Sequence, residues 1–187
     1  MSRTALRFLV ATCTALVVWA KSDIDINTKL PLSCPAHWNV TSAHMERLAY
    51  MWTHEHKVRN WIYKETADPS LANSTCALME YDTVVKVPQR FADFIPSRVT
   101  ETHVNKQVCA SRTELTERLR FSKIMLLGGF TITLHSSIDN EQQLVVFACT
   151  CNIALPWFTQ PLRQLIFGHV SKSILEYMQL LTDSLCK

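Results

Sequence analysis

The sequence predicts an α+β fold in which an antiparallel β-meander wraps around one long C-terminal amphipathic helix. Two observations predict it. Apolar and polar residues alternate with a period of two through much of residues 77–155. Residues 159–185 instead repeat apolar side chains every three or four positions, which is typical of a helix lying on an apolar surface. Short polar turns separate the alternating segments, so neighbouring strands should be antiparallel.

A strand and a helix are expected before the meander. The alternation over residues 23–30 predicts a first strand. Thr41 or Ser42 can then cap a helix that runs to about Tyr63, because apolar residues follow at near-helical spacing.

The meander itself is bounded by proline, glycine and polar turns. Its strands are expected at residues 77–87, 98–110, 113–122, 130–135 and 144–155. Asp139-Asn140 predicts the hairpin turn that precedes the last strand. One face of that strand should carry Val145, Phe147, Cys149, Cys151 and Ile153.

The closing helix should begin at Thr159, which can cap it, with Pro161 in its first turn. Its apolar stripe is formed by Ile166, Val170, Ile174, Tyr177 or Met178, Leu181 and Leu185. A stripe of this length must lie against something apolar of similar length, and the sheet is the only candidate.

Residues 1–20 are typical of a cleavable signal peptide. Arg3 and Arg7 precede an apolar run that is short for a membrane span, and Val18 and Ala20 are the small residues expected before the cleavage site. An uncleaved anchor and a mitochondrial presequence are the alternatives. We expect residues 21–187 to form a single secreted domain, extracellular or in the lumen of the secretory pathway, with no later transmembrane segment.

Two sequons and six cysteines agree with this destination. The sequons predict N-glycosylation at Asn39 and Asn73. An even number of cysteines remains once Cys13 leaves with the signal peptide, which predicts up to three disulfides of unknown pairing. The candidates are Cys34, Cys76, Cys109, Cys149, Cys151 and Cys186. Cys149 and Cys151 share one face of a strand, so they are poorly placed to bond each other and should find separate partners.

Charge and motifs argue against several classes of function. Without Arg3 and Arg7, 17 basic residues oppose 16 acidic ones, which gives no argument for a nucleic-acid partner. The histidines of His54-Glu55-His56 lie two apart, whereas zinc ligands on a helix need a spacing of four. His103 and Cys109 would lie about 20 Å apart on one strand, too far for a nucleophile pair. We therefore expect neither an enzyme nor a metal or other cofactor.

Five segments of the second half share a pattern with one structural superfamily. They are residues 99–104 and 115–121 in the middle strands, 130–137 and 144–149 in the last hairpin, and 155–158 before the closing helix. Together they resemble the START-like (SRPBCC) superfamily over roughly residues 77–185. The resemblance implies the helix-grip fold, usually with seven strands, and a small hydrophobic ligand such as a lipid or sterol between the sheet and the last helix. Most of these proteins are intracellular and poor in cysteine, unlike this chain.

The ligand would contact the apolar faces of the sheet and helix. Those faces are expected to present Leu119, Phe121, Phe130, Ile132, Leu134, Val145, Phe147, Ile166, Val170, Ile174 and Tyr177. The same residues would form an ordinary core in a filled domain. Glu117 interrupts this face, and we expect it to pair with an arginine or lie at a sheet edge, unless it holds a ligand head group. The first hypothesis is a secreted carrier of a small hydrophobic ligand. The alternative is a secreted glycoprotein module with a filled core that binds a protein partner through its outer surface.

Overall fold

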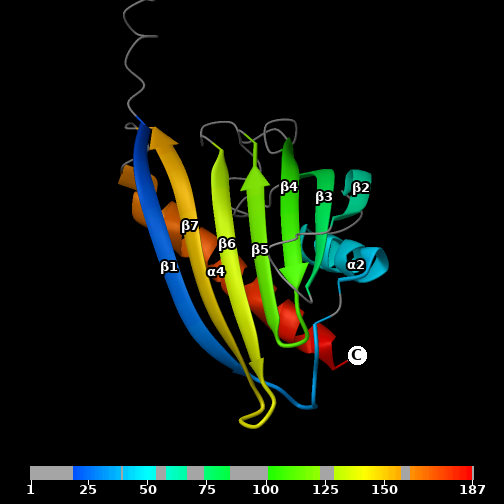
Figure 1. The fold of residues 1–187 in the computed structure, drawn as a ribbon. Coiled ribbons are helices and arrows are strands. Elements are labelled where there is room, and N and C mark those ends of the chain that lie inside the picture. Colours follow the sequence, from blue (N-terminus) through cyan, green and yellow to red (C-terminus); the bar gives the residue numbers. More distant parts are fainter. Residues whose placement is uncertain are drawn as a thin grey trace, which may run out of the picture.

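In the part of the chain that the structure describes, seven antiparallel strands form one sheet, and two helices lie against one of its faces (Figure 1). The computed structural model describes residues 19–38, 40–53, 58–66, 74–84, 101–122, 129–156 and 161–186. The elements in chain order are β1 (Trp19–Pro31), α2 (Ser42–Thr53), β2 (Arg59–Thr66), β3 (Thr75–Val84), β4 (Glu101–Ala110), β5 (Glu114–Phe121), β6 (Phe130–Asp139), β7 (Leu144–Pro156) and α4 (Arg163–Leu185).

The strands follow one another across the sheet in a meander, as the sequence predicts. The spatial order is β1-β7-β6-β5-β4-β3-β2, so only β1 departs from chain order. It pairs with β7 along its whole length, from Trp19 opposite Pro156 to Pro31 opposite Leu144. Asp139 stabilises the β6–β7 turn because its carboxylate accepts hydrogen bonds from the backbone N–H groups of Glu141 and Gln142.

The segment Arg59–Thr66 is a strand, and the expectation that the first helix reaches Tyr63 is wrong. Helix α2 ends at Thr53, and β2 pairs with β3. The run Trp61-Ile62-Tyr63 combines aromatic and β-branched side chains, which favour a pleated surface over a helix. This strand completes the sheet of seven.

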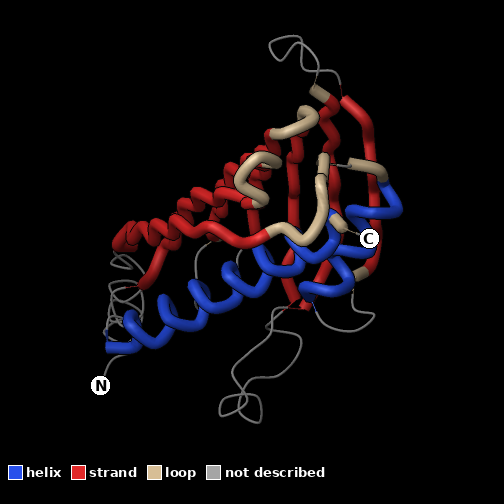
Figure 2. Tube along the Cα trace, turned by 90° about the horizontal axis from the view of Figure 1, so that it is seen from below, coloured by secondary structure: helices blue, strands red, loops and turns tan. Residues whose placement is uncertain are grey.

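The core lies between the sheet and the C-terminal half of α4. Buried side chains alternate along every inner strand, and the predicted face of β7 is confirmed, since Val145, Phe147, Cys149, Cys151 and Ile153 are all buried. Helix α4 runs along one side of the sheet with α2 beside its C-terminal end (Figure 2). The helix buries Ile174, Tyr177, Met178 and Leu181, whereas Ile166, Val170 and Leu185 are only partly buried.

Two disulfides hold the domain together, and both are compatible with a secreted protein. Cys34 bonds Cys186, which ties the loop after β1 to the C-terminal end of α4. Cys76 bonds Cys109, directly opposite each other on β3 and β4.

The expectation that Cys149 and Cys151 find separate partners is wrong, because both are buried free thiols. Their strand neighbours on either side are isoleucine and leucine residues of β1 and β6 rather than cysteines. Burial raises the pKa of Cys149 to about 11 and that of Cys151 to about 12, so both stay protonated and unreactive.

Some predictions fall outside the described residues. They include both sequon asparagines, Asn39 and Asn73, and residues 1–18 of the predicted signal peptide. Trp19 and Ala20 form the start of β1, opposite Pro156 and Leu155. In the described part of the chain, no helix is long and apolar enough to cross a membrane.

Candidate functional site

The eleven predicted ligand-contacting residues converge between the sheet and α4. Eight are buried, namely Leu119, Phe121, Ile132, Leu134, Val145, Phe147, Ile174 and Tyr177. The other three, Phe130, Ile166 and Val170, are partly buried and pack against the same core. The sequence therefore identifies a real apolar layer, and the open question is whether any space remains within it.

The hollow in this layer is very small. It has a volume of about 10 Å³ and is lined by Leu119, Ile132, Leu134, Cys149, Ile174 and Tyr177. One water molecule needs about 10–15 Å³ together with polar partners, whereas small-molecule sites occupy about 300–1,000 Å³. Where these six side chains meet, the space between sheet and helix is filled by protein.

Glu117 lies at the centre of this layer, and its partner is a lysine. The side chain is 0% exposed and its charged partner is Lys106. The expectation of an arginine partner or a position at a sheet edge is therefore wrong. Its Oε1 lies 2.9 Å from Nζ of Lys106 on β4. Its Oε2 accepts a 2.8 Å hydrogen bond from the hydroxyl of Tyr177 on α4, and that hydroxyl accepts a 2.6 Å hydrogen bond from Lys106. We call Lys106, Glu117 and Tyr177 the buried triad.

The buried triad joins two strands to the closing helix. Tyr177 has a pKa held well above its ordinary value, first by burial and then by the charge of Glu117, so the phenol stays protonated and donates. The contact between Lys106 and Oε1 is close but lacks hydrogen-bond geometry, which leaves Oε1 without a hydrogen bond. A buried ion pair costs desolvation that its attraction barely offsets, whereas loss of one partner would leave the other charge buried and uncompensated. The triad orients α4 on the sheet and is closed to a substrate.

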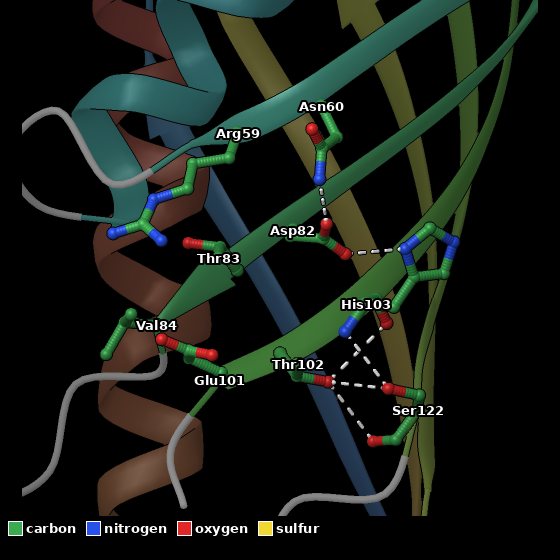
Figure 3. A pocket seen from close by; sticks show the side chains of 9 residues that line it. All are labelled: Arg59, Asn60, Asp82, Thr83, Val84, Glu101, Thr102, His103 and Ser122. Carbon is green, nitrogen blue, oxygen red and sulfur yellow. Dashed lines mark hydrogen bonds and ion pairs between the residues drawn. The ribbon is translucent and has the colours of Figure 1, made fainter. Parts of the chain in front are cut away.

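A second polar cluster lies in the open at one edge of the sheet, where β3 ends and β2 and β4 begin. These strand ends surround a cleft of about 350 Å³ (Figure 3). It is lined by Arg59, Asn60, Asp82, Thr83, Val84, Glu101, Thr102, His103 and Ser122. We call it the strand-end cleft.

One side of the strand-end cleft is organised around Asp82. Its Oδ2 accepts a 2.6 Å hydrogen bond from Asn60, and its Oδ1 lies 2.8 Å from Nδ1 of His103 (Figure 3). These hydrogen bonds, that from Asn60 most of all, lower the pKa of Asp82. Because a carboxylate only accepts, Nδ1 of His103 carries the proton and Nε2 is left as the acceptor of the neutral ring. His103 and Asp82 have side chains 44% and 42% exposed, so solvent and solutes reach them.

Ser122 does not extend this cluster into a catalytic triad. Its hydroxyl accepts a 3.0 Å hydrogen bond from the backbone N–H of His103, not from the ring (Figure 3). Cys109 is bonded to Cys76. Its sulfur is therefore not a free nucleophile, which agrees with the rejection of a Cys109–His103 nucleophile pair from the sequence.

The sequence pattern alone does not predict the strand-end cleft. Asp82 and His103 are 21 residues apart and meet only because they are register partners on β3 and β4. Asn60 lies on the strand that was mistaken for a helix. The alternation of β3 and β4 places both Asp82 and His103 on the outer face, so a correct register would have found this pair.

A second open hollow lies at the opposite end of the sheet. It has a volume of about 560 Å³, and its lining includes Trp38, Val40, Glu65 and Arg112. Trp38 is fixed there because its indole N–H donates a 3.2 Å hydrogen bond to the carbonyl of Thr113.

Comparison with known proteins adds no assignment. No protein-family model matches the chain, and no curated protein matches it. Among solved structures it is similar to an uncharacterized protein from Rhizobium leguminosarum, with a TM-score of 0.44 and 8% sequence identity. The match covers 89% of this chain and 98% of that one. A likeness of this degree supports no inference about function.

Proposed function

We propose that this chain is a secreted binding module of the helix-grip type, with a filled core, that acts through its outer surface. The observation that carries the proposal is a small hollow between sheet and helix, with a volume of about 10 Å³, that is lined by Leu119, Ile132, Leu134, Cys149, Ile174 and Tyr177. A sterol or lipid would need a volume more than tenfold larger. Two larger hollows formed by described residues, of about 350 and 560 Å³, both open on the outside.

The buried triad adds a second argument against an apolar ligand. An apolar molecule placed beside Glu117 and Lys106 would have to break the polar contacts of these two buried charges, and it could offer no polar contact in return. Tyr177 already occupies the position from which a ligand head group would meet Glu117, since its hydroxyl donates to Oε2.

A carrier of a small hydrophobic ligand remains the second candidate, on one observation. Ile166, Phe167 and Val170 of α4 and Ile24 and Ile26 of β1 are only partly buried. This seam is apolar, so a ligand could enter there if the N-terminal half of α4 moved away from β1.

Of the two open hollows, the strand-end cleft is the better candidate for the working surface. Trp38 and Val40, which flank the sequon residue Asn39 in sequence, line the other hollow. We infer that a glycan on Asn39, one residue along the chain from each of them, would hinder a partner there.

Native mass spectrometry of the full chain purified from the secreting cells tests the proposal. The expected spectrum contains protein and glycan masses only, and titration with the fluorescent fatty acid cis-parinaric acid gives no saturable signal. A retained lipid mass, or saturable uptake of the fatty acid, would overturn the filled-core module and favour the carrier.

A further inference from the structure

We propose that the strand-end cleft binds a neutral polyhydroxylated ligand, the sugar unit of a glycan. This inference rests on the proposed function, because it assumes that the outer surface is the working one. The volume of about 350 Å³ lies at the lower end of the range for small-molecule sites.

The groups that remain available in the cleft form a set that is balanced between hydrogen-bond donors and acceptors. Asp82 uses both carboxylate oxygens on the Asn60 amide and the His103 ring, so its oxygens are already engaged within the cluster, although its negative charge remains. Among the described residues, neither Arg59 nor Glu101 has an ion-pair partner, and they supply one cation and one anion. With Nδ1 engaged by Asp82, the neutral form of the His103 ring would add an acceptor at Nε2.

This balance favours sugar hydroxyls over ions. A hydroxyl both donates and accepts hydrogen bonds, so it binds best where the lining of a cleft offers donors and acceptors together. An anion would be repelled by Glu101, and a cation by Arg59. Among the described residues, no group of three or more His, Cys, Asp or Glu side chains is placed to hold a metal ion.

Thr83 gives an independent sign of a missing partner. It is 3% exposed, lines the cleft, and its hydroxyl has no hydrogen-bond partner. Figure 3 shows that hydroxyl directed toward the side of Arg59, a long exposed side chain that can move aside. A buried hydroxyl without a partner costs about 1–3 kcal/mol, which a ligand hydroxyl would recover.

The cleft is also organised before any ligand arrives. Asn60 has a positive φ of 56°, a conformation that costs energy for a residue other than glycine and that occurs often at binding sites. It falls where the pairing of β2 with β3 shifts register, between Arg59 and Ile62. This irregularity places the Asn60 amide on Asp82, and Asp82 in turn fixes the ring of His103.

The test is a titration of the ¹⁵N-labelled full chain, followed by amide chemical shifts. The probes are methyl α-mannoside, galactose and N-acetylglucosamine, with inorganic phosphate and calcium chloride as comparators. At least one sugar should produce saturable shifts centred on Asn60, Thr83 and His103, and neither comparator should do so. His103→Ala and, separately, Glu101→Gln should each weaken that sugar about tenfold or more, as loss of one hydrogen bond to a well-placed group would.

Glu114→Gln, at an exposed position on β5 outside the cleft, is the matched control and should bind like the parent. Saturable shifts with phosphate or calcium alone, no saturation with any sugar, or sugar shifts unchanged by both cleft variants would overturn the inference. If sugars fail while the purified protein also carries no lipid, the sugar assignment falls and the filled-core module stands.

Discussion

Lys106, Glu117 and Tyr177 lie buried beneath α4, whereas Asn60, Asp82 and His103 lie exposed where β3 ends and β2 and β4 begin. Both clusters place a carboxylate between two donors at distances of 2.6–2.9 Å. They differ in surroundings, since Glu117 is 0% exposed and Asp82 is 42% exposed.

That difference separates a structural role from a binding role. In the core, each polar group depends on the others, because water cannot replace a lost partner. At the strand ends, water competes for every hydrogen bond, so the contacts add little stability but can be exchanged for those of a ligand. The predictions below alter one cluster at a time.

The largest effect should come from removing Glu117. Glu117→Ala leaves Lys106 buried without a counter-charge, and the free energy of unfolding should fall by about 3–5 kcal/mol in urea denaturation. The triple variant Lys106→Met/Glu117→Leu/Tyr177→Phe removes every polar member and should recover most of that loss. If Glu117→Ala were as stable as the parent protein, the buried triad would not stabilise the packing of α4.

A smaller loss is expected from Tyr177→Phe. The ring still fills its place, but Glu117 loses a donor and Lys106 an acceptor, which should cost about 1–3 kcal/mol. The same urea titration measures it, and no change would mean that Glu117 and Lys106 satisfy each other without the hydroxyl.

Substitutions in the exposed cluster should hardly change the free energy of unfolding. Asp82→Asn or His103→Ala should lower the free energy of unfolding by less than about 1 kcal/mol, and less still in high salt. A loss as large as that of Glu117→Ala would contradict the contrast between the two clusters.

Acid should distinguish His44 from Asp82 by pH range. His44 lies on α2, outside both polar clusters, and its Nε2 is 3.5 Å from the hydroxyl of Ser184 on α4. Burial, and then the charges of Arg47 and Lys106, lower the pKa of His44, so the folded state resists its protonation and stability falls as pH drops below 6.5. Asp82 also has a lowered pKa, and its contribution is complete above 3.8 and lost as pH falls through the lowered value. In pH-dependent unfolding curves, His44→Gln should flatten the upper range and Asp82→Asn only the lower one. Identical curves for the two variants would contradict this assignment.

The sequence predicts the frame of the fold well because hydrophobic periodicity is a local signal. It identifies the alternating strands, the antiparallel meander and the buried face of β7 correctly. It fails at Arg59–Thr66, because the helical spacing of apolar residues ends at Thr53 and the predicted helix continues past it into a segment that is a strand. It also fails for Cys149 and Cys151, because an even number of cysteines does not reveal which of them form disulfides.

The candidate sites were harder to predict because they depend on register. Glu117 was recognised as an anomaly on an apolar face, but its partners come from another strand and from a helix 60 residues away. His103 was seen only as part of a nucleophile pair, since nothing local connects it to Asp82 or Asn60. Whether the apolar layer is filled depends on how the side chains of β5, β6, β7 and α4 fit together. The spacing of apolar residues in the sequence carries no information on that fit.

The most direct test of the filled core is the stability of Ile174→Ala measured beside Lys172→Ala. Ile174 is 3% exposed and lines the small hollow, whereas Lys172 is exposed on the same helix. In a filled core, Ile174→Ala should lower the free energy of unfolding by about 2–5 kcal/mol, and Lys172→Ala should change it by no more than about 0.5 kcal/mol. A loss at Ile174 as small as that at Lys172 would mean that this side chain already faces a void or a ligand, and would contradict the account.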